Sequence, residues 1–241
     1  MDAAILTSVF QNRVLFNYAL VGSFMLSVAD HFQTFAREVR LVWPKQRSII
    51  KFLYLYTRYS PWIYGPMMIN KDVAVTLKFG QCAGHTTASS LINMSTIVAA
   101  EAIMFVRVYA ICGKNRTLLF WLIFQFIAIH VAAYVFLSIF LTSFVFFPTP
   151  LPTHMACFPV ASDTQKLVYV YVLIIVSEFI IMLISLFGFW KFRAANSQLF
   201  KTLRQDGILY FFALVAISFA NILFDVAVPD QSLRFILSIP R

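Results

Sequence analysis

The chain has 241 residues, of which 61% are hydrophobic and only 12% charged, and its formal net charge is +9. The charged share is about half that of a typical soluble domain, and a water-soluble fold of this length could not bury so much apolar surface. The basic residues lie in short stretches between apolar runs, so they indicate membrane orientation rather than nucleic-acid binding.

Six apolar stretches are long enough to cross a bilayer, which takes about 20 residues. They predict an all-α fold, a polytopic bundle of transmembrane helices that forms a single domain over residues 1–241. The predicted spans cover residues 14–35, 49–69, 88–112, 118–146, 167–190 and 207–228.

Within the second predicted span, Pro61 follows Arg58-Tyr-Ser. Proline has no backbone N–H to donate to the carbonyl of Thr57, so we expect a kink at this point.

The loops that connect these spans differ in charge. Basic residues concentrate in residues 37–51, 113–117 and 191–206, which places these loops in the cytoplasm and the N-terminus outside or in a lumen. We expect a multi-pass protein of the plasma membrane or an endomembrane. The lipid bilayer is its first partner, and the three basic loops are candidate sites for an unknown ligand or cytoplasmic partner.

The last residues, 229–241, contain an apolar run too short to span a membrane. Either the protein has six helices with both ends outside, or a seventh helix is missing from this version of the chain.

Cys82 and Cys157 both fall in loops predicted to face outside, where a disulfide can persist. A bond between them would tie the start of the third span to the loop between the fourth and fifth spans. The alternative is two thiols, because sequence alone does not set the Cα separation.

Ionisable residues within a membrane span are costly and are therefore candidates for function. Asp30 and Arg58 lie at similar predicted depths, so we expect an ion pair, which could serve only to fix helix register. Glu101 and Glu178 fall near the midplane. They could bind a cation or a proton, each find a hydroxyl or Arg partner, or stay protonated; Arg58 could also serve Glu101.

No recognised catalytic motif occurs in the chain, and its four histidines are dispersed. We therefore expect no enzyme activity, no cofactor and no metal site.

Several short motifs occur in order along the chain. They are Asp30-His31, Arg37-Glu38-Val39, Leu41-Val42-Trp43, Lys51, Leu53-Tyr54, Arg58-Tyr59, Glu101-Ala102, Arg107-Val108-Tyr109-Ala110, Arg204-Gln205-Asp206-Gly207-Ile208-Leu209-Tyr210 and Asn221. Together these motifs resemble a fungal family of multi-pass membrane proteins, the domain of unknown function 6533. The resemblance implies a seven-helix bundle of the kind found in basidiomycete-type fungi, without an assigned biochemical function. The chain departs from that pattern after its sixth predicted span.

Two functions are compatible with these features. A receptor-like or signalling role fits the outside N-terminus, the candidate disulfide and the Arg107-Val-Tyr109 sequence at the inner end of the third span. The alternative is a small-solute transporter or a proton-coupled transporter that uses the intramembrane residues Glu101, Glu178 and Arg58.

Overall fold

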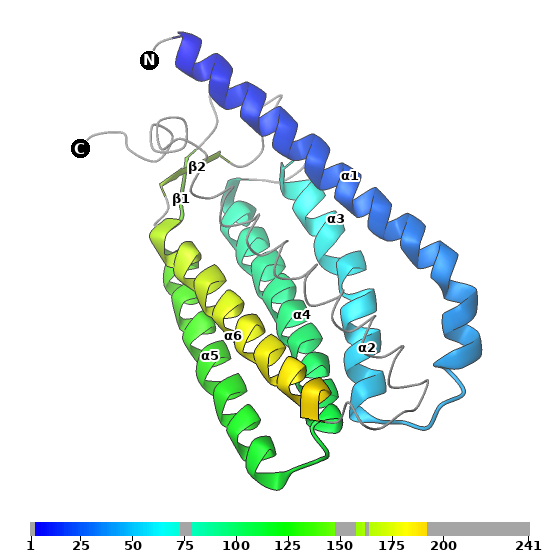
Figure 1. The fold of residues 1–241 in the computed structure, drawn as a ribbon. Coiled ribbons are helices and arrows are strands. Elements are labelled where there is room, and N and C mark those ends of the chain that lie inside the picture. The colour runs from blue at the N-terminus through cyan, green and yellow to red at the C-terminus, as the bar shows by residue number, and fades with distance from the viewer. Residues whose placement is uncertain (1–2, 73–78, 148–157, 162–163, 192–241) are drawn as a thin grey trace. The chain divides into compact units, whose positions relative to one another are not determined.

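The computed structural model describes residues 3–72, 79–147, 158–161 and 164–191, and helices make up nearly all of them (Figure 1). The described residues also contain one pair of strands, which lies between two helices in the element order. In chain order the elements are α1 (Ala3–Leu41), α2 (Ile49–Tyr59), α3 (Pro61–Asp72), the 3₁₀ turn η1 (Phe79–Gln81), α4 (Cys82–Ile111), α5 (Arg116–Thr142), β1 (Val145–Phe147), β2 (Phe158–Ala161) and α6 (Thr164–Lys191).

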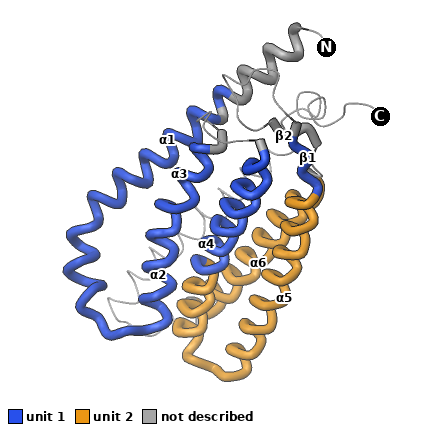
Figure 2. The backbone as a smooth tube through the Cα atoms, turned by 180° about the vertical axis from the view of Figure 1, so that it is seen from behind, with its two compact units in different colours: residues 1–100, 143–162, 229–241 blue, residues 101–142, 163–228 orange. Residues whose placement is uncertain are grey.

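The chain divides into two compact units (Figure 2). Unit 1 comprises residues 1–100, 143–162 and 229–241, and in it α1 and α2 each pack against α3. Unit 2 comprises residues 101–142 and 163–228, and in it α5 packs against α6. Helix α4 contributes residues to both units. The single-domain organisation expected from the sequence stays a prediction.

In the part of the chain that the structure describes, three helical segments are long and apolar enough to cross a membrane: Cys82–Ile111, Arg116–Thr142 and Gln165–Gly188. They correspond to the third, fourth and fifth spans predicted from the sequence. On α5, exposed Phe120, Phe124, Ile127 and Val131 recur at helical spacing and form one apolar face. Such helices indicate a membrane protein whose exposed side chains contact lipid.

The first two predicted spans are helical, but their boundaries differ from the expectation. Helix α1 extends beyond residues 14–35 at both ends. Residues 49–69 are divided at Ser60 into α2 and α3, each shorter than a span requires. The interruption lies directly before Pro61, the first residue of α3, which has no backbone N–H to continue the helix, and the expected kink itself stays a prediction. The sixth predicted span, 207–228, lies outside the described residues.

The predicted fourth span, 118–146, ends too late. Helix α5 stops at Thr142, and Val145–Phe147 form strand β1, which pairs antiparallel with β2. A β-branched residue and two aromatic residues favour a strand, and the residue before Pro148 is disfavoured in a helix. An apolar run is compatible with either structure, which explains the error.

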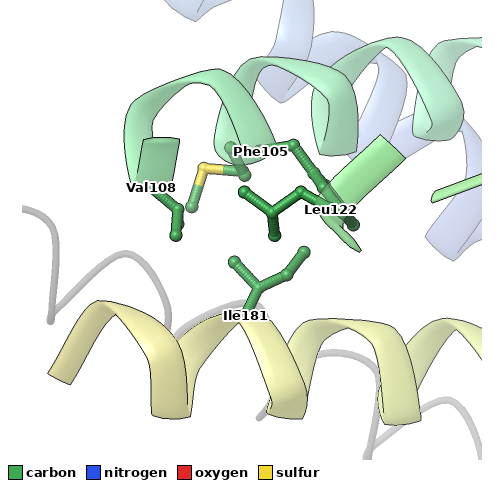
Figure 3. Close-up of a cluster of buried hydrophobic side chains, with 5 residues drawn as sticks. Phe105, Val108, Leu122 and Ile181 are labelled. Atoms are coloured by element: carbon green, nitrogen blue, oxygen red, sulfur yellow. The ribbon is translucent and has the colours of Figure 1, made fainter. Parts of the chain in front are cut away.

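The hydrophobic core of unit 2 joins three helices (Figure 3). Phe105 and Val108 come from α4, Leu122 from α5 and Ile181 from α6, and Met104 completes the cluster. Val108 and Ile181 are almost fully buried. This cluster fixes the end of α4 against α5 and α6, and it thereby positions the polar residues on the same helices.

Candidate functional site

Glu38, near the end of α1, is the centre of a polar cluster in unit 1. Its carboxylate is buried and accepts hydrogen bonds from Trp43 Nε1 at 3.1 Å and from the Tyr59 hydroxyl at 3.0 Å, both to Oε1. Its Oε2 forms an ion pair with Arg58 Nε of α2. A buried charge is tolerated only when it is paired and hydrogen-bonded in this way.

Arg58 also contacts α1 at two further points. Its Nη2 donates to Thr34 Oγ1 and, at 3.3 Å, to the backbone carbonyl of His31. His31, Thr34 and Glu38 recur at i, i+3 and i+7, so they share the face of α1 that meets α2. The cluster thus fastens α2 to one stripe of α1.

The predicted ion pair between Asp30 and Arg58 is wrong, because the acid that pairs with Arg58 is Glu38. Asp30 is exposed, about 100° around the helix from His31. Helical side chains also lean toward the N-terminus of their own helix, which separates these two side chains in antiparallel helices. The side chain of Arg58 therefore extends toward Glu38 and the loop between α1 and α2, whereas the side chain of Asp30 extends away from Arg58.

The pKa of Glu38 lies below its ordinary value. Burial acts to raise the pKa, but the hydrogen bonds from Trp43 and Tyr59 and the charge of Arg58 lower it by more. The carboxylate is therefore held in its ionised form near neutral pH.

Two pairs of hydroxyl groups connect helix α4 to α2 and to the break that follows α2, within unit 1. The Tyr56 hydroxyl lies 2.5 Å from Ser95 Oγ, and Ser60 Oγ lies 2.7 Å from Thr96 Oγ1. Ser95 and Thr96 both donate to the carbonyl of Ile92, so Tyr56 and Ser60 are the donors in these pairs. These contacts were not predicted, because a serine or threonine in a helix commonly bonds only to its own backbone.

Glu101 is the centre of a second polar cluster, in unit 2. Its side chain is buried, and its Oε2 accepts a hydrogen bond from Ser177 Oγ of α6 at 3.0 Å. The same oxygen lies 3.4 Å from His130 Nε2 of α5. Three helices that are each apolar enough to span a membrane therefore bring polar groups to one point.

Glu178 follows Ser177 and is also buried within unit 2. Of the alternatives open for the two glutamates, Glu101 takes a hydroxyl partner, Ser177. Arg58 belongs to unit 1, where it pairs with Glu38. His130 was one of several histidines in the sequence, and nothing in its spacing singled it out.

The Glu101 cluster brings together a carboxylate, a hydroxyl and an imidazole. Ser177 donates to Glu101 and not to His130, so the order of contacts is not that of a catalytic triad. Among the described residues, no group of three His, Cys, Asp or Glu side chains gathers as a metal ion would require.

Cys82 is buried at the start of α4. Cys157 lies outside the described residues, so the Cys82–Cys157 disulfide stays a prediction.

A family model, described as a family of unknown function (DUF6533), matches residues 18–63. The match confirms the resemblance over this segment. The segment contains His31, Thr34, Glu38, Trp43 and Arg58. It therefore includes both residues of the ion pair between Glu38 and Arg58. No curated protein and no solved structure matches the chain.

Proposed function

We propose that this chain is an integral membrane protein with six spans that carries a small polar solute coupled to protons. The spans are those predicted from the sequence, except that the fourth ends at Thr142, and the N-terminus lies outside or in a lumen. We extend the family resemblance beyond the matched segment to Glu101–Ala110 and residues 204–210, which implies the multi-pass setting of the fungal family.

The observation that supports transport is the burial of Glu101 among three apolar helices. An ionisable group within a spanning helix is expensive, and such groups mark ion and proton pathways. Glu101 contacts a histidine and a hydroxyl, both of which can exchange protons.

Further polar atoms in the same unit support a solute that forms hydrogen bonds. Glu101 Oε1, both amide atoms of Gln125 and Ser185 Oγ are buried without a hydrogen-bond partner among the described residues. Such groups are costly unless something pairs with them. A small solute with both donors and acceptors suits this set.

A receptor-like or signalling role is the second candidate. The turn between α4 and α5 supports it, because the basic side chains of Lys114 and Arg116 are both exposed there and are open to contact with a partner. Lys114 has a left-handed φ of 57° in this turn. This turn lies in the basic loop 113–117, one of three loops proposed to bind a cytoplasmic partner.

The test is proton movement in liposomes that contain the purified chain and an internal pH-sensitive dye. Gradients of amino acids, monosaccharides and short carboxylic acids are applied in turn. We expect at least one solute class to drive a pH change. Glu101→Gln should abolish it, because the amide cannot take up a proton, whereas Asp30→Asn, at an exposed site, should retain it.

A correctly folded wild-type protein that moves protons with none of these solutes would overturn the transport proposal and leave the receptor-like role. A pH change that persists in Glu101→Gln would contradict the role of Glu101.

A further inference from the structure

The ring of His130 has a defined tautomer. Its Nδ1 lies 2.7 Å from the backbone carbonyl oxygen of Phe126, one turn earlier on α5. A carbonyl oxygen can only accept, so Nδ1 must carry a proton. In the neutral imidazole Nε2 is then the acceptor.

That second nitrogen faces a carboxylate oxygen. His130 Nε2 lies 3.4 Å from Glu101 Oε2. A neutral imidazole nitrogen and an ionised carboxylate are both acceptors, so the two would repel each other. One proton between them, on either group, makes the contact attractive. The Ser177 hydroxyl donates to the same oxygen and orients the carboxylate.

We propose that Glu101 and His130 together form a binding site for one exchangeable proton, located between Glu101 Oε2 and His130 Nε2. The site deepens the proposed function, because it names the pair that would hold the coupled proton. With one proton the pair has no net charge, whether the proton sits on Glu101 or on His130. Losing it leaves one negative charge and gaining a second leaves one positive charge, and both states are disfavoured in a buried site.

The surroundings of the pair favour this neutral state. The Phe126 ring lies 4.1 Å from the His130 ring, centroid to centroid, and adds apolar contact. Glu178 of α6 is the third buried ionisable group in the described part of unit 2. Arg107 and Arg116 are exposed near helix ends, and Lys166, which is partly exposed, lies at the start of α6.

Nitrogen NMR of the full chain in lipid nanodiscs, labelled with ¹⁵N-histidine, tests the site. Comparison with a His130→Asn variant assigns the signals. We expect Nδ1 to be protonated throughout the range from about pH 5 to 9, which brackets the ordinary histidine value. The Nε2 signal should be displaced from that of a free neutral imidazole, and Glu101→Gln should remove most of this displacement.

Asp30→Asn is the control, because it changes an exposed acid that lies outside unit 2 and should leave the His130 signals in place. Should Glu101→Gln fail to fold, Ser177→Ala takes its role. Without the hydroxyl the carboxylate is less stable, so the proton should shift toward Glu101 and the Nε2 signal toward the neutral form.

The proposal is overturned if His130 carries its proton on Nε2 rather than Nδ1, or if its signals are the same in wild type and in the folded variant. The spectra need no transported solute. A proton site without flux would therefore refute the transport function alone, and flux without this signature would refute the site alone.

Discussion

Glu38 and Glu101 are both buried carboxylates, but they differ in what balances their charge. Glu38 has a guanidinium and two neutral donors around it, so its ionised form is stabilised. Glu101 has a hydroxyl and an imidazole, so its charge is balanced only when a proton is present. The first arrangement suits a fixed structural contact, and the second suits a group that binds and releases a proton.

Replacing Glu38 with glutamine tests the structural role. The amide keeps the shape but loses the charge that Arg58 faces, so we expect a loss of about 2 kcal/mol of unfolding free energy at neutral pH. Thermal unfolding in detergent micelles, followed by tryptophan fluorescence, measures the change. Asp30→Asn, an exposed acid on the same helix, is the control and should leave the melting temperature unchanged.

The pH dependence of this loss has a definite sign. The pKa of Glu38 is lowered in the folded protein, so its contribution to stability is present above its ordinary value of 4.5 and is lost as pH falls through the folded value. The difference in unfolding free energy between the wild type and Glu38→Gln should therefore become smaller as the pH drops through the pKa of Glu38 in the folded protein. A deficit that stays constant from neutral to acid pH would contradict the ion pair.

At the scale of elements, the sequence predicted which segments form helices better than it predicted which side chains meet between helices. Long apolar runs identify α4, α5 and α6, because few other structures accommodate them. The helix break before Pro61 follows from the missing N–H. The expected partner of Arg58 was wrong, because equal depth in the membrane does not determine which side chains meet. Helical side chains tilt toward the N-terminus of their own helix, and Glu38 lies on the face of α1 that meets α2. The contact of His130 with Glu101 depends on how three helices pack, which residue spacing does not reveal.

Gly65 determines how closely α1 approaches α3 in unit 1. A Cβ placed there would lie 2.5 Å and 2.6 Å from two ring carbons of Phe24. Gly65→Ala should therefore destabilise the protein by about 1–3 kcal/mol through overpacking. Gly22 on α1 has nothing within 4 Å of such a Cβ, so Gly22→Ala should stabilise slightly by improving helix propensity.

A second substitution distinguishes a steric effect from a backbone effect. Phe24→Leu in the Gly65→Ala background should restore part of the lost stability, as measured by thermal unfolding of all four proteins in a double-mutant cycle. Additive effects would show that Phe24 is not what Gly65 accommodates.

For the whole molecule, the two buried clusters lie in different units, and each joins helices within its own unit. In unit 1 the cluster fastens α2 to α1, and hydroxyl pairs connect α2 and the following break to α4. In unit 2 the cluster joins α4, α5 and α6, three helices suited to cross the membrane. A proton pathway through unit 2 requires that these helices do cross it.

The topology of α4 to α6 is therefore the measurement to make. Glycosylation acceptor cassettes are inserted separately after Pro44, within residues 148–157 and after Lys191, and each protein is expressed in microsomes. The account predicts a glycan only on the cassette within 148–157, because that loop faces the lumen and the other two sites face the cytoplasm. Glycosylation after Pro44 or Lys191, or its absence within 148–157, would contradict the proposed crossing of the membrane.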